Sequence, residues 1–87
     1  MRNITFTTNG WEDYEYWLGQ DRKTLKRINK LIKDAQRTPT TGIGKPEALK
    51  FDLKGSWSRR IDDANRLVYT VSDDAIIILA CRYHYDD

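Results

Sequence analysis

The end of the chain gathers side chains that are suited to acid–base chemistry. The only histidine, His84, lies in Arg82-Tyr83-His84-Tyr85, directly after an unbroken apolar run from Ala75 to Cys81. Such a run is typical of a central strand that is buried on both faces. It is expected to carry an imidazole, a guanidinium and two phenols to the rigid end of a sheet.

Upstream segments supply a carboxylate and further cations. Glu47 stands between lysines in Gly44-Lys45-Pro46-Glu47-Ala48-Leu49-Lys50. Arginines follow in Trp57-Ser58-Arg59-Arg60-Ile61 and in Asn65-Arg66-Leu67-Val68-Tyr69. One carboxylate, one histidine and several arginines, without a cluster of metal ligands, form a set that can cleave a phosphodiester by acid–base chemistry.

Other chemistries find less support in the sequence. One His, one Cys and no clustered acidic motif indicate neither a zinc site nor a two-metal site. The segment Gly42-Ile43-Gly44-Lys45 lacks the spacing of a phosphate-binding loop, and no serine lies in a nucleophile elbow. We therefore expect a reaction that needs no metal and no cofactor.

Length and composition predict one domain over residues 1–87, because the chain is too short for two cores. No apolar stretch is long enough to span a membrane, and no signal peptide opens the sequence. The single Cys81 cannot form an internal disulfide, and its apolar setting predicts a small buried side chain rather than a nucleophile. These features predict a soluble cytoplasmic protein.

The charge is unevenly distributed, although the net charge is only +2. Residues 22–37 contain seven basic side chains against Asp34 alone, which gives this segment a net charge of +6. A basic helix face on a nearly neutral protein suggests a polyanion or an acidic peptide as partner. The alternative is an ordinary solvated helix face.

A strand and two helices are predicted in the first half of the chain. Alternation predicts the strand over residues 3–7. The first helix starts near Trp11, with Thr8 or Asn9 as its cap, and ends at Gly19. Its apolar stripe is expected to pack in the core and comprises Trp11, Tyr14, Trp17 and Leu18.

The second helix begins after Asp21, which caps it, and ends at Thr38-Pro39, because a residue before proline avoids helical backbone. A loop follows over residues 38–47. The expected buried face of the helix comprises Leu25, Ile28, Leu31, Ile32 and Ala35.

The second half of the chain predicts antiparallel strands over residues 57–61 and 67–71 and over the apolar run 75–81, while residues 49–53 fit either a short strand or irregular structure. The predicted fold is α+β, with two N-terminal helices packed on a twisted, mainly antiparallel sheet of four to five strands.

The alternation of side chains along the strands leaves open whether Arg60 and Arg66 lie on the same face of the sheet. A four-residue loop over 62–65 places Arg60 and Arg66 on opposite faces, whereas a five-residue loop or a bulge brings them together.

The order of these segments resembles the YoeB/Txe branch of the RelE-type toxins of bacterial toxin–antitoxin modules, over nearly the whole chain. The resemblance implies a RelE-like, microbial-ribonuclease-like fold, a homodimer and a ribosome-dependent messenger RNA endoribonuclease that acts in the A site of the 30S subunit. It also implies neutralisation by a YefM/Axe-type antitoxin, with operator DNA bound only through that antitoxin. The segments that carry the resemblance are Trp11-Glu12-Asp13-Tyr14 with Tyr16-Trp17, Arg37-Thr38-Pro39, Gly44-Lys45-Pro46-Glu47 with Leu49-Lys50, Trp57-Ser58-Arg59-Arg60-Ile61, Arg66-Leu67-Val68-Tyr69 and Ala80-Cys81-Arg82-Tyr83-His84-Tyr85.

Carried over by position, the resemblance implies three catalytic residues, namely Glu47, Arg66 and His84. Supporting positions, which bind substrate or phosphate, match Lys50, Arg60 and Tyr85. The chain departs from the family pattern by continuing past Tyr85 to Asp86 and Asp87. Two extra carboxylates beside His84 can tune activity, for instance by repelling RNA.

Taken singly, each of these residues has an ordinary structural explanation. A glutamate between lysines is usually a surface ion pair of little energetic value, and Arg59-Arg60 fits a solvated strand edge. The rival functions are a binding module without catalysis, a toxin of the same fold with another target, and a ribonuclease that needs no ribosome.

Overall fold

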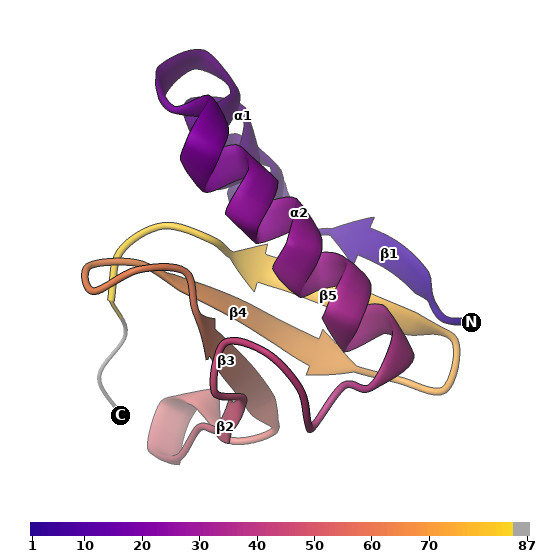
Figure 1. Ribbon diagram of the computed structural model, residues 1–87. Coiled ribbons are helices and arrows are strands. Elements are labelled where there is room, and N and C mark those ends of the chain that lie inside the picture. Colours follow the sequence, from indigo (N-terminus) through magenta and orange to yellow (C-terminus); the bar gives the residue numbers. More distant parts are fainter. Residues whose placement is uncertain (85–87) are drawn as a thin grey trace.

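The computed structural model describes residues 1–84, which form a five-stranded sheet with two helices on one face (Figure 1). The strand order is β1-β5-β4-β3-β2, with β1 parallel to β5 and the other pairs antiparallel. The predicted α+β fold is therefore confirmed. The elements are β1 (Asn3–Phe6), α1 (Thr8–Gln20), α2 (Arg22–Arg37), β2 (Glu47–Ala48), the 3₁₀ helix η1 (Phe51–Leu53), β3 (Ser56–Arg60), β4 (Arg66–Val71) and β5 (Ala75–Ala80).

Asp21 separates the two helices and caps both of them. Its backbone N–H donates to Trp17 O, which closes α1, and its side chain accepts from the N–H groups of Lys23 and Thr24, which opens α2. Because the extended backbone of Asp21 sets the boundary, α1 runs past the predicted end at Gly19. The first helix also begins earlier than predicted, with Thr7 as its cap.

The buried face of α2 is as predicted, since four of its five expected residues are buried and Leu25 is partly buried. The predicted core stripe of α1 is wrong at two positions. Trp17 is buried, but Trp11 is 48% exposed and Leu18 is 61% exposed. Instead of entering the core, the Trp11 ring packs on Phe6 and Tyr14 at centroid distances of 5.5 and 5.6 Å, in an aromatic cluster at the surface.

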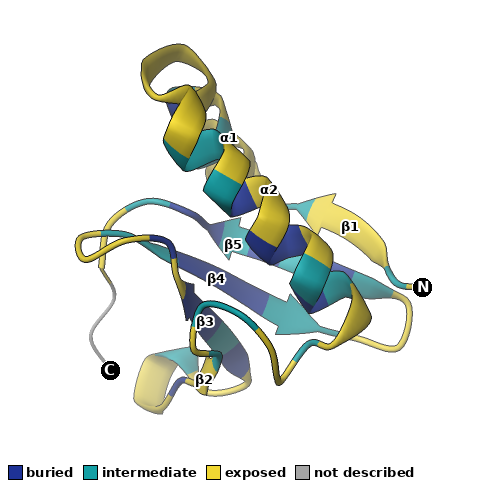
Figure 2. Ribbon diagram, in the orientation of Figure 1, coloured by how far each residue is buried: buried dark blue, intermediate teal, exposed yellow. Residues whose placement is uncertain are grey.

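The two faces of the sheet are covered unequally (Figure 2). The larger core lies between the helices and one face, where Leu67, Tyr69, Ile76 and Ile78 are buried. We call the other side the open face. It is covered only in part, by a small cluster of Leu49, Val68 and Ala80 against which Leu53 of η1 packs. For this reason the apolar run of β5 is not buried on both faces throughout, and Ile77 and Leu79 remain partly exposed.

A β-bulge in β5 changes the side to which the end of this strand faces. Tyr69 pairs with Ile78, whereas its neighbour Val68 pairs with Ala80, so Leu79 is an extra residue. The extra residue turns Ala80 to the open face and returns Cys81 to the larger core.

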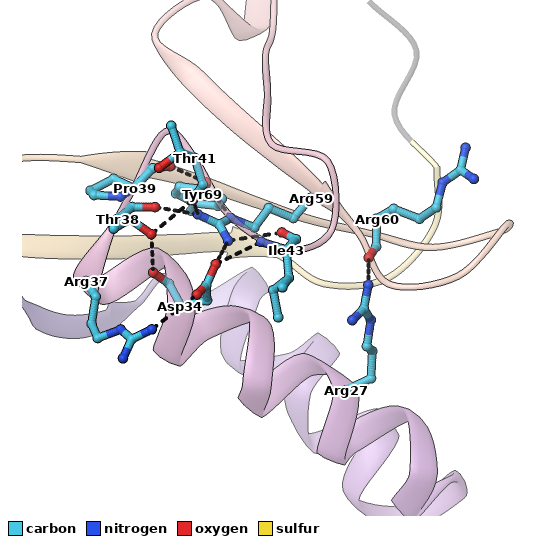
Figure 3. A network of polar contacts seen from close by, with 10 residues as sticks. All are labelled: Arg27, Asp34, Arg37, Thr38, Pro39, Thr41, Ile43, Arg59, Arg60 and Tyr69. Atoms are coloured by element: carbon cyan, nitrogen blue, oxygen red, sulfur yellow. Dashed lines mark hydrogen bonds and ion pairs between the residues drawn. The ribbon is translucent and has the colours of Figure 1, made fainter.

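Arg59 is the centre of a buried polar network (Figure 3). Its side chain is fully buried, so the alternative of a solvated strand edge is wrong at this position. Each of the five N–H groups of its guanidinium can donate one hydrogen bond, and five acceptors lie within 2.6–3.0 Å. The acceptors are the Tyr69 hydroxyl, Asp34 Oδ2 and the carbonyl oxygens of Thr38, Thr41 and Ile43.

This network, which we call the Arg59 network, fixes the loop 38–46 between α2 and β2. The Tyr69 hydroxyl donates to Pro39 O at 2.6 Å, and the Ile43 N–H donates to Asp34 Oδ2 at 2.9 Å. Gly42, with φ +117°, lies so close to the Asp34 carboxylate that a side chain at this position would collide with it. The loop therefore follows one path although it contains no regular structure.

We predict that Asp34→Ala lowers the free energy of unfolding by about 3–5 kcal/mol, because it leaves the buried Arg59 charge without its counter-ion. The measurement is chemical denaturation at neutral pH. Asp73→Ala, at an exposed turn position, serves as the matched control and should change stability by about 0.5 kcal/mol or less. Equal stability of the two variants would contradict a structural role for the ion pair.

The difference between Asp34→Ala and the unmodified protein should also depend on pH. The Arg59 guanidinium, followed by the Ile43 N–H, lowers the pKa of the Asp34 carboxyl below its ordinary value of 3.8. A lowered pKa in the folded state means that the stabilisation is fully present above pH 3.8 and is lost as the pH falls through the lowered value. The two unfolding free energies should therefore converge in acid.

Candidate active site on the open face of the sheet

Glu47 begins β2 and lies on the open face. It is the cross-strand partner of Ser58, which in turn pairs with Val68 on β4. The next residue, Ala48, pairs with Trp57, whose side chain packs against the larger core. Because successive side chains of a strand alternate between faces, Glu47 and its row point away from the helices. The Glu47 side chain is exposed there.

The position of Glu47 depends on the loop that precedes it. The Arg59 network holds residues 38–43, and the N–H of Arg60 donates to Gly44 O at 2.6 Å. Lys50 follows three residues after Glu47, immediately before η1, and is exposed. Of the two candidate residues of this segment, Glu47 therefore lies at the edge of the open face beside β3, and Lys50 is an exposed residue of the connection to η1.

Arg60 and Arg66 are direct cross-strand partners on the open face. The loop between β3 and β4 has five residues, 61–65, which resolves the parity question in favour of the same face. Two like charges directly opposite each other destabilise a sheet. The pair is therefore not explained by a contribution to stability.

The guanidinium of Arg66 is held from one side only. Its Nη1 donates to Asp62 O at 2.6 Å and to Asn65 O at 3.1 Å, so the turn fixes its direction. Its Nε and Nη2 carry the other three N–H groups of the guanidinium. The Arg60 guanidinium makes a long exposed contact of 3.9 Å with Asp63, and such a pair contributes little stability.

The chain after β5 leads His84 to the start of β4. The N–H of Arg66 donates to Tyr83 O at 2.9 Å, so the backbone of residue 83 lies directly beside that of Arg66. His84 is the next residue and is exposed. Tyr85, Asp86 and Asp87 lie outside the described residues.

The fold thus brings three distant segments to one end of the sheet. From the spacing of strands and residues in a sheet, the Cα atoms of Glu47 and Arg66 are about 12 Å apart, with β3 between them. Side chains of this length can reach one phosphodiester from both sides. His84 approaches from the remaining side, where the chain runs beside β4.

Other residues that hold the end of the chain were not identified from the sequence. Asp13 Oδ2 accepts from the N–H of Cys81 at 3.0 Å, and the indole N–H of Trp17 donates to Cys81 O at 2.7 Å. Asn65 Oδ1 accepts from the N–H of Tyr83 at 2.7 Å. The sequence carries no local signal for these contacts, because most of them join residues 64 or more positions apart.

Cys81 is a buried side chain rather than a nucleophile, as predicted. Burial, followed by the Asp13 charge, raises the pKa of its thiol to about 12, so the thiolate is scarce at neutral pH.

Among residues 1–84, no three His, Cys, Asp or Glu side chains are grouped in a way that could hold a metal ion. In the same residues, no helix is long and apolar enough to cross a membrane.

Comparisons with known proteins give one consistent result. The family described as "YoeB-like toxin of bacterial type II toxin-antitoxin system" matches residues 6–85. The chain is 61% identical to Toxin YoeB of Streptomyces coelicolor over 82 residues, which is 94% of this chain and 98% of that protein.

Solved structures agree with the sequence comparison. The YoeB dimer from Staphylococcus aureus superimposes with a TM-score of 0.90 at 50% identity, over 97% of this chain and 98% of that one. The toxin in the heterotetrameric YoeB–YefM toxin–antitoxin complex from the same organism gives a TM-score of 0.88 at 50% identity, over 98% of this chain and 99% of that one. Because the family match covers most of the chain and the fold agrees with that of the relatives, this chain belongs to the YoeB-like toxins of bacterial type II toxin–antitoxin systems.

Proposed function

We propose that this toxin is a ribosome-dependent endoribonuclease, which cleaves messenger RNA in the A site of the 30S subunit and so inhibits translation. The observation that carries the proposal is the convergence of Glu47, Arg66 and the His84 segment at one end of the sheet. A carboxylate, a guanidinium and an imidazole match the three tasks of phosphodiester cleavage.

The proposed reaction uses the 2′-hydroxyl of the RNA itself and requires neither metal nor cofactor. Glu47 removes the proton of this hydroxyl as general base, and the 2′-oxygen forms a bond to the adjacent phosphorus. The bond from phosphorus to the 5′-oxygen breaks, and protonated His84 donates its proton to that oxygen. The products carry a 2′,3′-cyclic phosphate and a 5′-hydroxyl. Each proton transfer of this kind typically contributes about 10²–10⁴-fold to the rate.

The cations stabilise the charge that develops on the phosphate oxygens. Arg66 presents Nε and Nη2 in the fixed planar fork that suits a phosphate. Arg60, directly opposite on β3, adds positive charge beside Arg66, and Lys50 of the segment after β2 is proposed to reach the phosphate as well. Tyr85 positions the phosphate or stacks on a base.

The basic face of α2 is the proposed docking surface for the partners. It consists of exposed side chains, namely Arg22, Lys23, Lys26, Lys30, Lys33 and Arg37. An acidic, amphipathic segment of a YefM/Axe-type antitoxin folds onto this face and the sheet and thereby blocks or reshapes the site, in line with the YoeB–YefM complex of the relative. In the absence of antitoxin the same face contacts ribosomal RNA.

We further propose that the toxin acts in the cytoplasm as a homodimer, in line with the YoeB dimer of the relative. The toxin carries no base-reading element of its own in this proposal, so it reaches operator DNA only through the antitoxin.

We predict that purified toxin, treated with a metal chelator that is removed before the assay, cleaves ribosome-bound messenger, and that Glu47→Ala and His84→Ala each lower the rate by at least about 10²-fold. Because each change removes one proton-transfer group, the loss should appear in kcat. The measurement is single-turnover cleavage followed by mapping of the product ends.

Lys54→Ala, which removes an exposed charge next to η1, is the control and should cleave at the normal rate. Cleavage by Glu47→Ala at the rate of the unmodified toxin would contradict the proposed acid–base mechanism. The absence of cleavage by the folded, unmodified toxin would favour a binding module instead.

We also predict that reversing Lys26, Lys30 and Lys33 to Glu weakens binding to the antitoxin or to the ribosome without unfolding the protein. All three side chains are exposed, so the far-ultraviolet circular dichroism spectrum should not change. Titrations at several salt concentrations test this, because a protein that contacts fewer phosphates shows a smaller salt dependence. Unchanged affinity for both partners would exclude this face from recognition.

A further inference from the structure

We propose that Asn65 is a positioning residue, which holds the end of the chain in the one conformation that places His84 beside Arg66. This inference rests on the proposed function, since the benefit of the arrangement is realised only if His84 takes part in the reaction. Four observations on residues 13–84 support it.

The first observation is the orientation of the Asn65 amide. Its Nδ2 donates to both carboxylate oxygens of Asp62, at 3.1 and 3.3 Å, and its Oδ1 accepts from the N–H of Tyr83 at 2.7 Å. A carboxylate only accepts and a backbone N–H only donates, so both ends of the amide have a single compatible direction. The Asp62 carboxylate therefore directs the oxygen of Asn65 towards the chain after β5.

The second observation is the backbone of Tyr83. Its φ of +72° lies in the left-handed region, which a bulky residue rarely adopts because its side chain is crowded by the backbone there. Such a conformation persists only where the surroundings hold it. Here the Tyr83 N–H donates to Asn65 and the Tyr83 carbonyl accepts from the N–H of Arg66. These two bonds therefore select the direction in which the chain continues into His84.

The third observation is a separate attachment upstream. Both backbone groups of Cys81 are bound by α1, through Asp13 and Trp17. The guanidinium of Arg82 then lies 3.5 Å from the centroid of the Tyr16 ring, a cation–π contact. Only one residue thus separates the attachment at α1 from the attachment at Asn65, and His84 directly follows the second.

The fourth observation is that one turn serves both catalytic candidates. The carbonyl oxygens of Asp62 and Asn65 accept from Nη1 of Arg66, while the side chain of Asn65 holds Tyr83. The turn 62–65 therefore sets the distance between the guanidinium and the segment that carries His84. Loss of the Asn65 oxygen frees residue 83 to adopt ordinary backbone angles, and His84 then leaves its place.

The test compares three variants in single-turnover cleavage of ribosome-bound messenger. Asn65→Ala should lower kcat by at least about ten-fold, since a displacement of about 1 Å can cost about 10²-fold, and should leave KM unchanged. Asn65→Asp retains an oxygen that accepts from Tyr83 but loses the Nδ2 that donates to the Asp62 carboxylate, so it should lower kcat less than Asn65→Ala without restoring it fully. Asn9→Ala also removes one exposed side-chain bond, from Asn9 Nδ2 to Leu79 O at 2.9 Å, and should behave normally.

A double-mutant cycle separates positioning from loss of stability. If Asn65 acts through His84, then Asn65→Ala should have no further effect on the rate in the His84→Ala background. An equal loss in both backgrounds would overturn the proposal, and so would an unchanged kcat in Asn65→Ala.

NMR spectra of the toxin without RNA test the positioning role of Asn65 separately from the proposed function. His84 is the only histidine, so its ring gives a single set of imidazole signals in NMR spectra. Asn65→Ala should shift and sharpen these signals as the segment gains freedom, whereas Asn9→Ala should not. Unchanged ring signals in Asn65→Ala would refute the positioning role. If the unmodified toxin cleaves no RNA, the proposed function fails, while the NMR comparison still decides whether Asn65 holds this segment.

Discussion

The burial of one charged side chain, Arg59, determines how the rest of the site is assembled. A guanidinium that is removed from water must satisfy five N–H groups and one positive charge. Here three of the acceptors are carbonyl oxygens of the loop 38–46, which therefore wraps around the guanidinium, and Asp34 of α2 supplies the counter-charge. The loop is thus bound to β3 and α2 together. Burial of the charge is unfavourable in itself, but its hydrogen bonds hold the loop in a single path. This path ends at Glu47 on the open face.

A second constraint acts on the opposite side of the site. The bulge at Leu79 returns Cys81 to the core, where α1 binds both of its backbone groups. The turn 62–65 then holds Tyr83 and Arg66 together. The three catalytic candidates come from three segments, each fixed by hydrogen bonds to backbone groups. Attachments of this kind are what a reaction based on positioning and fixed charges requires.

Much of the fold follows from the sequence because it depends on local patterns. Short runs of adjacent residues are enough to predict the buried face of α2, the helix cap at Asp21 and the apolar strand β5. The candidate residues Glu47, Arg66 and His84 came from a family resemblance, and the structure places their segments together.

The burial of Arg59 was not foreseen, because most of its partners are backbone carbonyls that no residue type reveals. Arg60 and Arg66 lie on the same face only because the loop between their strands has five residues rather than four. The alternation of residues within strands does not determine the length of that loop. Trp11 and Leu18 follow the period of a buried stripe, but Trp11 packs on Phe6 of the edge strand β1, and both side chains stay largely exposed.

The central claim is that Glu47 and His84 transfer protons while the RNA supplies its own nucleophile. The most direct test is a ribosome-bound messenger that carries a single 2′-deoxynucleotide on the 5′ side of the scissile phosphate. The account predicts that the unmodified messenger is cut to a 2′,3′-cyclic phosphate and a 5′-hydroxyl, and that the substituted messenger binds but is not cut at that position, because the attacking oxygen is missing. Cleavage of the substituted messenger at the same phosphate would show that water or a protein group is the nucleophile, and would contradict the proposed roles of both residues.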